Sequence, residues 1–155
     1  IGDWSSDVCS SDLVDNMTPQ QRSQTMAAIR SCGNRTTEQA LIQLFRSNRI
    51  TGWRRKTKLV GQPDFVFHRE RIAVFVDGCF WHGCPRCHFE PASNSKYWLE
   101  KIRRNRKRDR FVTRELATLG WKIIRIWEHS LKQPNRVVKR MRAVLMKDET
   151  LPRIR

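Results

Sequence analysis

The stretch IAVFVDGCFWHGCPRCH, residues 72–88, decides how the remainder of this chain is expected to fold. Its first five residues are apolar, which predicts a strand buried on both faces, as in the centre of a sheet with helices on each side. The next twelve residues contain one aspartate, three cysteines, two aromatic residues and two histidines. We therefore expect a central strand that leads directly into a carboxylate and a metal-type cysteine cluster.

Helical and strand patterns on both sides of this stretch predict an α/β fold. The final helix is the clearest, because its apolar residues recur at helical spacing: Val137, Val138, Met141, Val144 and Leu145. The preceding helix could draw its apolar side from Tyr97, Trp98, Ile102, Val112, Leu116 and Leu119. The expected strands cover residues 53–59, 64–67, 72–76 and 122–127, and the expected helices cover 18–29, 36–47, 96–119 and 136–147. This order predicts a mixed central sheet flanked by helices.

Capping and turn residues mark the limits of these elements. We expect Thr36 or Thr37 to cap the second helix and Gly120 to end the third. Residues 61–63, Gly-Gln-Pro, predict a turn that leads into the strand at 64–67. Glu38 falls in the first turn of the second helix, where a carboxylate suits the helix dipole.

The composition restricts the class of partner. The chain has 155 residues, with 31 Lys+Arg against 15 Asp+Glu, for a net charge of +16. This excess predicts a polyanionic partner, with nucleic acid ahead of an anionic membrane surface. No apolar run is long enough to span a bilayer, and we identify no secretory signal. Five cysteines, three of them within nine residues, favour a metal site in a reducing cytosol over a disulfide framework.

The first thirteen residues, IGDWSSDVCSSDL, differ from the remainder. They are rich in Ser and Asp, without periodicity or net positive charge, and they resemble a translated sequencing adapter. We exclude them from the fold prediction and expect residues 14–155 to form a single domain.

The cysteine cluster predicts a structural zinc site. Cys79-x4-Cys84-x2-Cys87 offers three soft ligands, and structural Zn²⁺ takes four Cys or His ligands in tetrahedral geometry. The fourth ligand is either the adjacent His88 or a distant residue. His129 is the better candidate, because it ends a strand expected near the loop and would tie the loop to the sheet.

Two carboxylates and a histidine indicate phosphodiester chemistry. Asp64 begins one predicted strand and Asp77 ends the next, so an antiparallel pair would bring both to one edge. Carboxylates that hold Mg²⁺ can activate water and neutralise phosphate charge. Many nucleases place a lysine two residues after the second carboxylate, where this chain has Cys79, so His82 could transfer the proton instead. The alternative is that these aspartates are turn or cap residues and that the histidine is structural.

Several motifs together resemble the very-short-patch repair (Vsr) DNA mismatch endonucleases. The matching segments are Pro63-Asp64, VDGCFWHGCP (76–85), YWLEKI (97–102), RDR (108–110), LGW (119–121) and IWE (126–128). The resemblance covers roughly residues 14–132 and implies a restriction-endonuclease-like fold with a structural zinc. It also implies Mg²⁺-dependent nicking of one strand, 5′ to the thymine of a T·G mismatch that arises when 5-methylcytosine deaminates.

The resemblance assigns roles to individual residues. Asp64 matches the metal-binding aspartate, the Val76 carbonyl a second metal contact, and His82 the catalytic histidine beside the scissile phosphate. Glu38 and Asp109 match acidic residues that support the site through hydrogen bonds and water.

The chain departs from the best-known members of the family in two respects, its set of zinc ligands and the residue at position 77. The implied zinc ligands are Cys79, Cys84, Cys87 and His129, with His88 as the alternative to Cys87. Asp77 stands where those members have histidine, so its role is open between metal ligand and support of the site.

The resemblance also implies a DNA-binding surface. Phe80, Trp81 and Trp98 match an aromatic wedge that enters the duplex from the major groove, and Met26 and Ile29 match the minor-groove side. The alternative for Met26, Ile29 and Trp98 is ordinary core packing. Seven of the ten residues 101–110 are basic, and they predict contacts with phosphates or, alternatively, a solvated helix face. The predicted contacts include Lys101, Arg104 and Arg108.

Three functions remain as hypotheses at this stage. The first is a monomeric mismatch-nicking endonuclease in the bacterial cytoplasm, associated with the nucleoid, with mismatch-repair proteins as candidate partners. The second is a zinc-stabilised DNA-binding module without catalysis, against which Asp64, Asp77 and His82 argue. The third is a restriction-type endonuclease that cuts both strands of matched DNA and would need a dimer.

Overall fold

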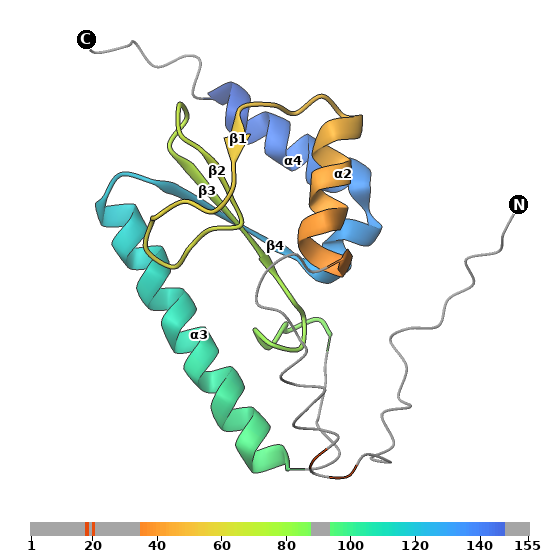
Figure 1. Ribbon diagram of the computed structural model, residues 1–155, viewed down its shortest axis with the longest axis vertical. Helices are drawn as coiled ribbons and strands as arrows, with labels where there is room; N and C mark the ends of the chain where they lie inside the picture. Colours follow the sequence, from red (N-terminus) through yellow and green to blue (C-terminus); the bar gives the residue numbers. More distant parts are fainter. Residues whose placement is uncertain (1–17, 19, 21–34, 88–93, 148–155) are drawn as a thin grey trace, which may run out of the picture.

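A computed structural model of the chain describes residues 18, 20, 35–87 and 94–147 (Figure 1). Three sequence predictions lie outside the described residues: the first thirteen residues, the alternative zinc ligand His88, and the helix 18–29 with Met26 and Ile29. Of that helix, only positions 18 and 20 are described. The elements are η1 (Arg35–Gln39), α2 (Ala40–Ser47), β1 (Trp53–Arg54), β2 (Phe65–Phe67), β3 (Ile72–Asp77), α3 (Ser95–Thr118), β4 (Lys122–Trp127), η2 (Glu128–Lys132) and α4 (Pro134–Lys147). In this part of the chain, no helix has the length and apolar character that crossing a membrane requires.

The strands form a mixed sheet in the order β1-β2-β3-β4. β2 pairs antiparallel with both β1 and β3, and β3 pairs parallel with β4. The connection between β2 and β3 is a tight turn, in which the Arg71 N–H donates to the His68 carbonyl at 3.3 Å. The apolar strand of residues 72–76 thus lies inside the sheet with a neighbour on each side, as predicted.

Helices cover both faces of the sheet, which confirms the predicted α/β architecture. Side chains of α2 and α4 form one core layer with alternate residues of the strands, including Phe45, Phe65 and Met141. A smaller layer on the other face joins Val112 and Leu116 of α3 to Ala73 and Phe75 of β3. Figure 1 shows this division, with α3 on one side of the strands and α2 and α4 on the other.

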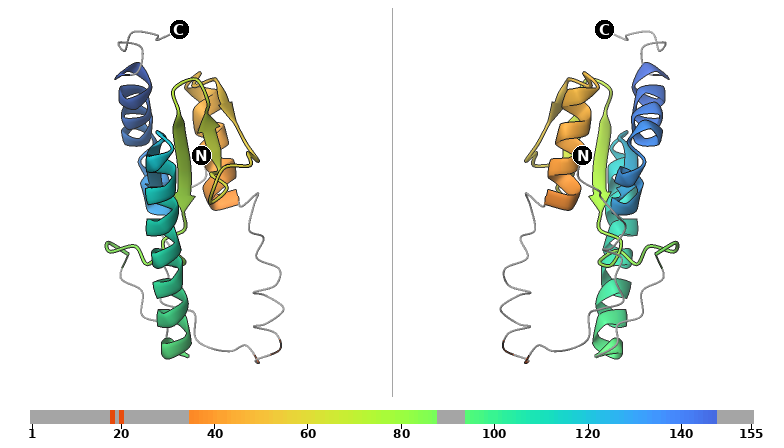
Figure 2. Two further views of the ribbon diagram at one scale, coloured as in Figure 1. Left: turned by 90° about the vertical axis from the view of Figure 1, so that its left-hand side faces the viewer. Right: turned by 90° about the vertical axis from the view of Figure 1, so that its right-hand side faces the viewer.

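The long helix α3 continues past the end of the strands, so its first half lies beside the loop that follows β3 (Figure 2). The prediction for the apolar side of α3 is only partly right. Trp98, Val112 and Leu116 are buried, whereas Tyr97 and Leu119 are 51% and 52% exposed. Helical periodicity identifies a face, but it does not tell where that face has a sheet to cover it.

Two glycine turns position the elements that matter for the site. Gly61 has φ +76°, and a Cβ there would lie 2.3 Å from Val112 Cγ1, so the predicted turn before Asp64 requires glycine. Gly120, also at φ +76°, ends α3 as predicted. Its N–H donates to Ala117 and the Trp121 N–H donates to Leu116, which is the Schellman arrangement.

Two predicted boundaries are wrong. The helix expected to start at Thr36 or Thr37 begins at Arg35 with a turn of π-helix and continues directly into α2. The extended segment expected over residues 53–59 is a strand only at Trp53–Arg54. Lys56 has φ +54°, which is outside the extended conformation that a strand requires, and its side chain is exposed.

Candidate active site and metal centre

Asp64 immediately precedes β2, and its side chain extends the pairing between β2 and β3. Its Oδ2 accepts a hydrogen bond from the Val76 N–H at 2.7 Å. The antiparallel pairing therefore brings the predicted metal-binding aspartate next to the end of β3, as the sequence led us to expect. Burial raises the pKa of Asp64 to about 6, and the nearby carboxylates of Glu38 and Asp77 add to this rise.

Asp77 is the last residue of β3 and is only 2% exposed. Its Oδ2 accepts a hydrogen bond from Arg125 Nη1 at 3.0 Å, and its Oδ1 lies 3.7 Å from His82 Nδ1. Burial raises the pKa of Asp77, while the positive charge of Arg125 opposes the rise. Both carboxylate oxygens thus face nitrogen-bearing side chains.

His82 and Asp109 form a close pair across the site. The distance from His82 Nδ1 to Asp109 Oδ2 is 2.6 Å, although these residues come from the loop after β3 and from α3. Burial acts to raise the pKa of Asp109, but hydrogen bonds from His82 and Arg125 hold it below its usual value. An imidazole oriented by a carboxylate is an arrangement suited to proton transfer.

Glu38 lies at the wall of the same site rather than serving only the dipole of its helix. It is 5% exposed and forms an ion pair with Arg55, which follows β1. The predicted residue is therefore joined to a cation that the sequence did not identify. A signal for Arg55 was present, since it belongs to the basic run at residues 54–58, but nothing in that run distinguishes one basic residue from another.

One groove of about 860 Å³ gathers all five predicted catalytic side chains: Glu38, Asp64, Asp77, His82 and Asp109. Its walls are basic. Lys56 and Lys58 line one part, and Lys101 and Arg108 of α3 line another. Arg104 is exposed on α3 but does not line the groove. The groove thus combines acidic and imidazole groups with a basic surround.

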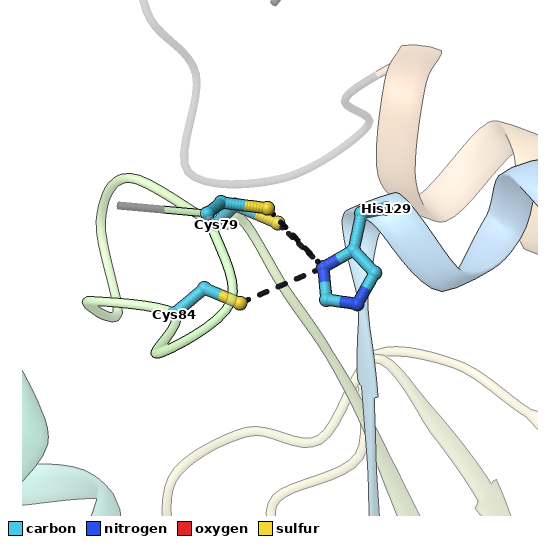
Figure 3. Close-up of side chains that lie close together, drawn as sticks. Cys79, Cys84 and His129 are labelled. Atoms are coloured by element: carbon cyan, nitrogen blue, oxygen red, sulfur yellow. Dashed lines mark hydrogen bonds between the residues drawn. The ribbon is translucent and has the colours of Figure 1, made fainter. Parts of the chain in front are cut away.

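The metal centre is built from the loop after β3 and from η2. The ligand atoms of Cys79, Cys84, Cys87 and His129 all lie within 4.8 Å of one another. The three sulfurs are 3.3, 3.5 and 3.5 Å from His129 Nδ1 (Figure 3). A tetrahedral Zn²⁺ with ordinary Zn–S and Zn–N bonds would separate sulfur from nitrogen by about 3.6 Å. The donors and their spacing therefore fit zinc.

Strand pairing explains how residues fifty positions apart meet at this centre. In the parallel pair of β3 and β4, Asp77 lies opposite Trp127. Cys79 and His129 each follow two residues later, so both leave the same edge of the sheet. The loop then turns back at Gly83, with φ +61°, and the Cys84 N–H donates to the Cys79 carbonyl at 2.9 Å.

The thiols differ in their electrostatic surroundings. Burial raises the pKa of Cys79 to about 12, and the neighbouring thiols add to the effect. Burial opposes ionisation of Cys84 as well, but hydrogen bonds from Cys87 and Arg86 hold the pKa of Cys84 below its usual value. Metal ligation requires thiolates, and a divalent cation would favour them throughout the cluster.

Known proteins with the same sequence pattern identify the family. The profile described as DNA mismatch endonuclease Vsr matches residues 14–88. The chain is 35% identical over 122 residues to the DNA mismatch endonuclease Vsr of Escherichia coli strain K12, covering 78% of this chain and 76% of that protein. This chain belongs to the Vsr family of DNA mismatch endonucleases. It is therefore a DNA endonuclease with a restriction-endonuclease-like fold.

Nicking enzymes are also among the relatives of this Vsr-family chain. It is 35% identical over 135 residues to the type II nicking enzyme V.XorIIP of Xanthomonas oryzae pv. oryzae, covering 86% of this chain and 98% of that protein. It is 50% identical over 68 residues to the type II nicking enzyme V.NaeI of Lentzea aerocolonigenes. That match spans 44% of this chain and 41% of the relative.

An aromatic cluster stands beside the groove of this Vsr-family chain. Phe80, Trp81 and Trp98 pack edge to face, with ring centroids 5.1 to 5.8 Å apart. The ammonium of Lys101 lies 5.6 Å from the centre of Trp81 and 5.7 Å from that of Trp98. Trp98 is 8% exposed and Tyr97 forms the outer ring of the cluster. The three predicted wedge residues are thus gathered at one place, with Trp98 inside it.

The sequence prediction missed Arg125, which contacts two of the acidic residues. It lies on β4, and its Nη1 and Nη2 donate to Asp77 Oδ2 and Asp109 Oδ1, each at 3.0 Å. A signal was available, because arginine is unusual inside the apolar strand KIIRIW. That signal does not name the partners, which depend on the register of β3 against β4 and on the placement of α3.

Proposed function

We propose that this chain nicks one DNA strand 5′ to the thymine of a T·G mismatch, in a reaction that depends on Mg²⁺. The observation that carries the proposal is the composition of the groove. Asp64, hydrogen-bonded to the Val76 N–H, and the His82–Asp109 pair both line it, and lysine and arginine side chains surround them. Membership of the Vsr family supplies the DNA substrate and the class of reaction.

Asp64 and the Val76 carbonyl are the groups that would hold Mg²⁺. Magnesium prefers oxygen ligands and binds through one or two carboxylates while keeping several waters. A buried carboxylate with a raised pKa, among other acidic groups, gains most from a nearby dication. The ion would supply charge neutralisation on the phosphate and would lower the pKa of attacking water.

His82 would act beside the scissile phosphate, held by Asp109. The Asp109 carboxylate lies 2.6 Å from Nδ1, which leaves Nε2 as the nitrogen available to substrate. An imidazole in that place can act as a proton-transfer group. Glu38 would support the site from the opposite wall through its pairing with Arg55.

The basic walls would hold the DNA backbone, and the aromatic cluster would recognise the mismatch. Lys101 and Arg108 line the groove, and Arg104 is exposed on the same helix. Phe80 and Trp81 would enter the duplex, with Trp98 packed behind them. A mismatched step costs less to unstack than a matched one, so insertion favours the mismatch. Met26 and Ile29 would act from the minor-groove side.

The cysteine centre would hold a structural Zn²⁺ through Cys79, Cys84, Cys87 and His129. All four positions are filled by protein donors, so the ion would have no open site for substrate. Its role would be to fix the loop that carries His82 to the end of β4. We further propose that the enzyme acts as a monomer in the cytoplasm.

The test uses a labelled duplex with one T·G mismatch, its matched T·A control and a pool of flanking sequences, with Mg²⁺ or EDTA. We expect Mg²⁺-dependent nicking of the thymine strand in the mismatched duplex alone. Cutting both strands of matched DNA would instead favour a restriction-type enzyme. Binding without cutting would favour a non-catalytic zinc module and return Asp64 and His82 to structural roles.

A further inference from the structure

Arg125 is the cation that joins two of the acidic residues in the groove. It projects from β4, whereas its partners Asp77 and Asp109 come from β3 and α3. Each terminal nitrogen donates to a different carboxylate at 3.0 Å. A single side chain thus connects three elements at the point where α3 leaves the apolar core.

The surroundings of Arg125 hold its fork in one orientation. Its guanidinium carbon lies 5.0 Å from the centre of the Phe75 ring, which is its register partner on β3. The side chain is 24% exposed, and its Nε is buried without a hydrogen-bond partner in the described part of the chain. The two carboxylates are therefore what orients the planar guanidinium, and it orients them in return.

We propose that Arg125 is a positioning residue: it fixes Asp109, and through Asp109 the ring of His82, while Asp77 serves to hold Arg125 rather than a metal ion. The inference rests on the proposed function, because it explains how the histidine of that site is oriented. Asp77 Oδ2 accepts a hydrogen bond from Arg125 at 3.0 Å, and Oδ1 is turned toward His82 Nδ1 at 3.7 Å, so the carboxylate is directed at these two side chains.

The face of α3 toward the groove shows why such an anchor is needed. Apolar packing holds the helix at Val112 and Leu116, but the turns facing the groove carry Lys101, Asn105 and Asp109. The Asp109 carboxylate has hydrogen-bond contacts with His82 and Arg125, so its direction depends on these two partners. Displacement of a catalytic group by about 1 Å can slow a reaction about 100-fold.

The experiment measures nicking of the T·G duplex under single-turnover conditions, with DNA affinity and thermal unfolding measured in parallel. We expect Arg125→Gln to slow nicking about 100-fold and Arg125→Lys about tenfold, with DNA affinity changed less than about threefold. Lysine keeps the charge but cannot span two carboxylates, so it restores only part of the rate. Arg136→Gln, which removes an exposed arginine in the first turn of α4 that is paired with Gln133, is the matched control and should leave the rate unchanged.

A double-mutant comparison separates positioning from a general effect on the fold. In an Asp109→Asn background, adding Arg125→Gln should slow nicking less than about twofold further, because the two residues act as one unit. Fully additive losses would overturn the proposal. If Arg125→Gln fails to fold, the double variant Asp77→Asn/Arg125→Gln removes both charges together and leaves no unpaired buried charge. We expect this double variant to nick about 100-fold more slowly than the wild type, and a wild-type rate would contradict the proposal.

The ring-nitrogen NMR signals of His82 provide a readout that does not depend on nicking. We expect Arg125→Gln to shift them, since Asp109 would no longer hold Nδ1, whereas Arg136→Gln should not. Unchanged signals would overturn the inference even if nicking slowed. A wild-type chain that nicks no duplex would overturn the proposed function, and these signals would still decide whether Arg125 positions His82.

Discussion

The cysteine centre and the carboxylate groove both start at the end of β3, two residues apart, yet they are assembled in opposite ways. Three of the four donors of the centre come from one nine-residue loop, and the fourth, His129, follows the neighbouring parallel strand. The five acidic and imidazole groups of the groove come from η1, the start of β2, the end of β3, its following loop and α3. A metal site can be encoded by short spacing, whereas a catalytic groove depends on how distant elements pack.

The two regions also differ in how they balance buried charge. The donors of the cysteine centre converge on one point at distances that suit Zn²⁺, so one ion would compensate all of them. In the groove, arginines compensate Glu38, Asp77 and Asp109, while Asp64 has only the Val76 N–H as a direct partner among the contacts described. The first region could hold a metal ion, whereas the second leaves the Asp64 carboxylate without an arginine hydrogen bond among the contacts described.

The largest expected effect is loss of the fold when the cysteine centre is broken. Cys84→Ala removes a buried donor, and structural zinc contributes its binding free energy to folding, about 10 kcal/mol or more in zinc-dependent peptides. We expect mostly insoluble or unfolded protein, measured by circular dichroism and zinc content. Val112→Ala, a core truncation in α3, should lower the unfolding temperature but retain zinc; a stable Cys84→Ala protein with full zinc would contradict the ligand set.

The next effect is on catalysis in the groove. Asp64→Asn keeps an oxygen for the Val76 N–H but loses the charge that would hold Mg²⁺. We expect nicking to fall by about 1,000-fold or more, with zinc content and DNA affinity preserved. Glu70→Gln, in the turn between β2 and β3, is the matched carboxylate control and should nick normally. Near-normal turnover by Asp64→Asn would remove Asp64 from the site.

The same substitution should affect stability in the opposite direction. The pKa of Asp64 is about 6 when folded and 3.8 as the reference value, so the folded state binds the proton more tightly. The stability contributed by that proton is present below about pH 4 and is lost as pH rises through about 6. In Mg²⁺-free buffer at pH 8, Asp64→Asn should therefore raise the free energy of unfolding by about 1–2 kcal/mol, and by less at pH 4. Denaturant titrations at both pH values measure this, and a gain that is equal at both would refute it.

The smallest effect concerns the basic wall after β1. Lys56 and Lys58 are exposed and line the groove. If each contacts one phosphate, Lys56→Gln with Lys58→Gln should reduce the slope of log affinity against log salt by about 2. Fluorescence anisotropy over a salt series measures the slope. Lys132→Gln with Lys139→Gln, exposed residues that do not line the groove, should leave it unchanged, and an equal loss in both pairs would indicate only net charge.

The local patterns of the sequence predicted the parts of the site that lie close together in the chain. The spacing of Cys79, Cys84 and Cys87 indicated a metal cluster, and the structure brings these residues together with His129. Apolar runs located β3 and β4, and the Gly61 turn located the strand that follows Asp64. Such features depend on local conformation and hydrophobic burial, which short segments encode directly.

Contacts between distant elements were less accessible from the sequence. The sequence predicted neither the link from Arg125 to Asp77 and Asp109 nor the pairing of Glu38 with Arg55, since both require strand register and helix placement. The exposure of Tyr97 and Leu119 was missed for a related reason. Tyr97 lies in the part of α3 that extends beyond the sheet (Figure 2), and Leu119 directly follows the last residue of that helix.

The sequence by itself thus determined an α/β chain with a central apolar strand, a zinc-type loop and a strongly basic surface. These properties follow from side-chain chemistry and short-range periodicity, which act before any long-range contact forms. The tertiary structure alone decided that Arg125 bridges two carboxylates, that His82 faces Asp109, and that Asp64 meets Val76. The physical reason is that hydrogen bonds and ion pairs require atoms within about 3 Å, and only packing of the whole sheet and its helices sets such distances.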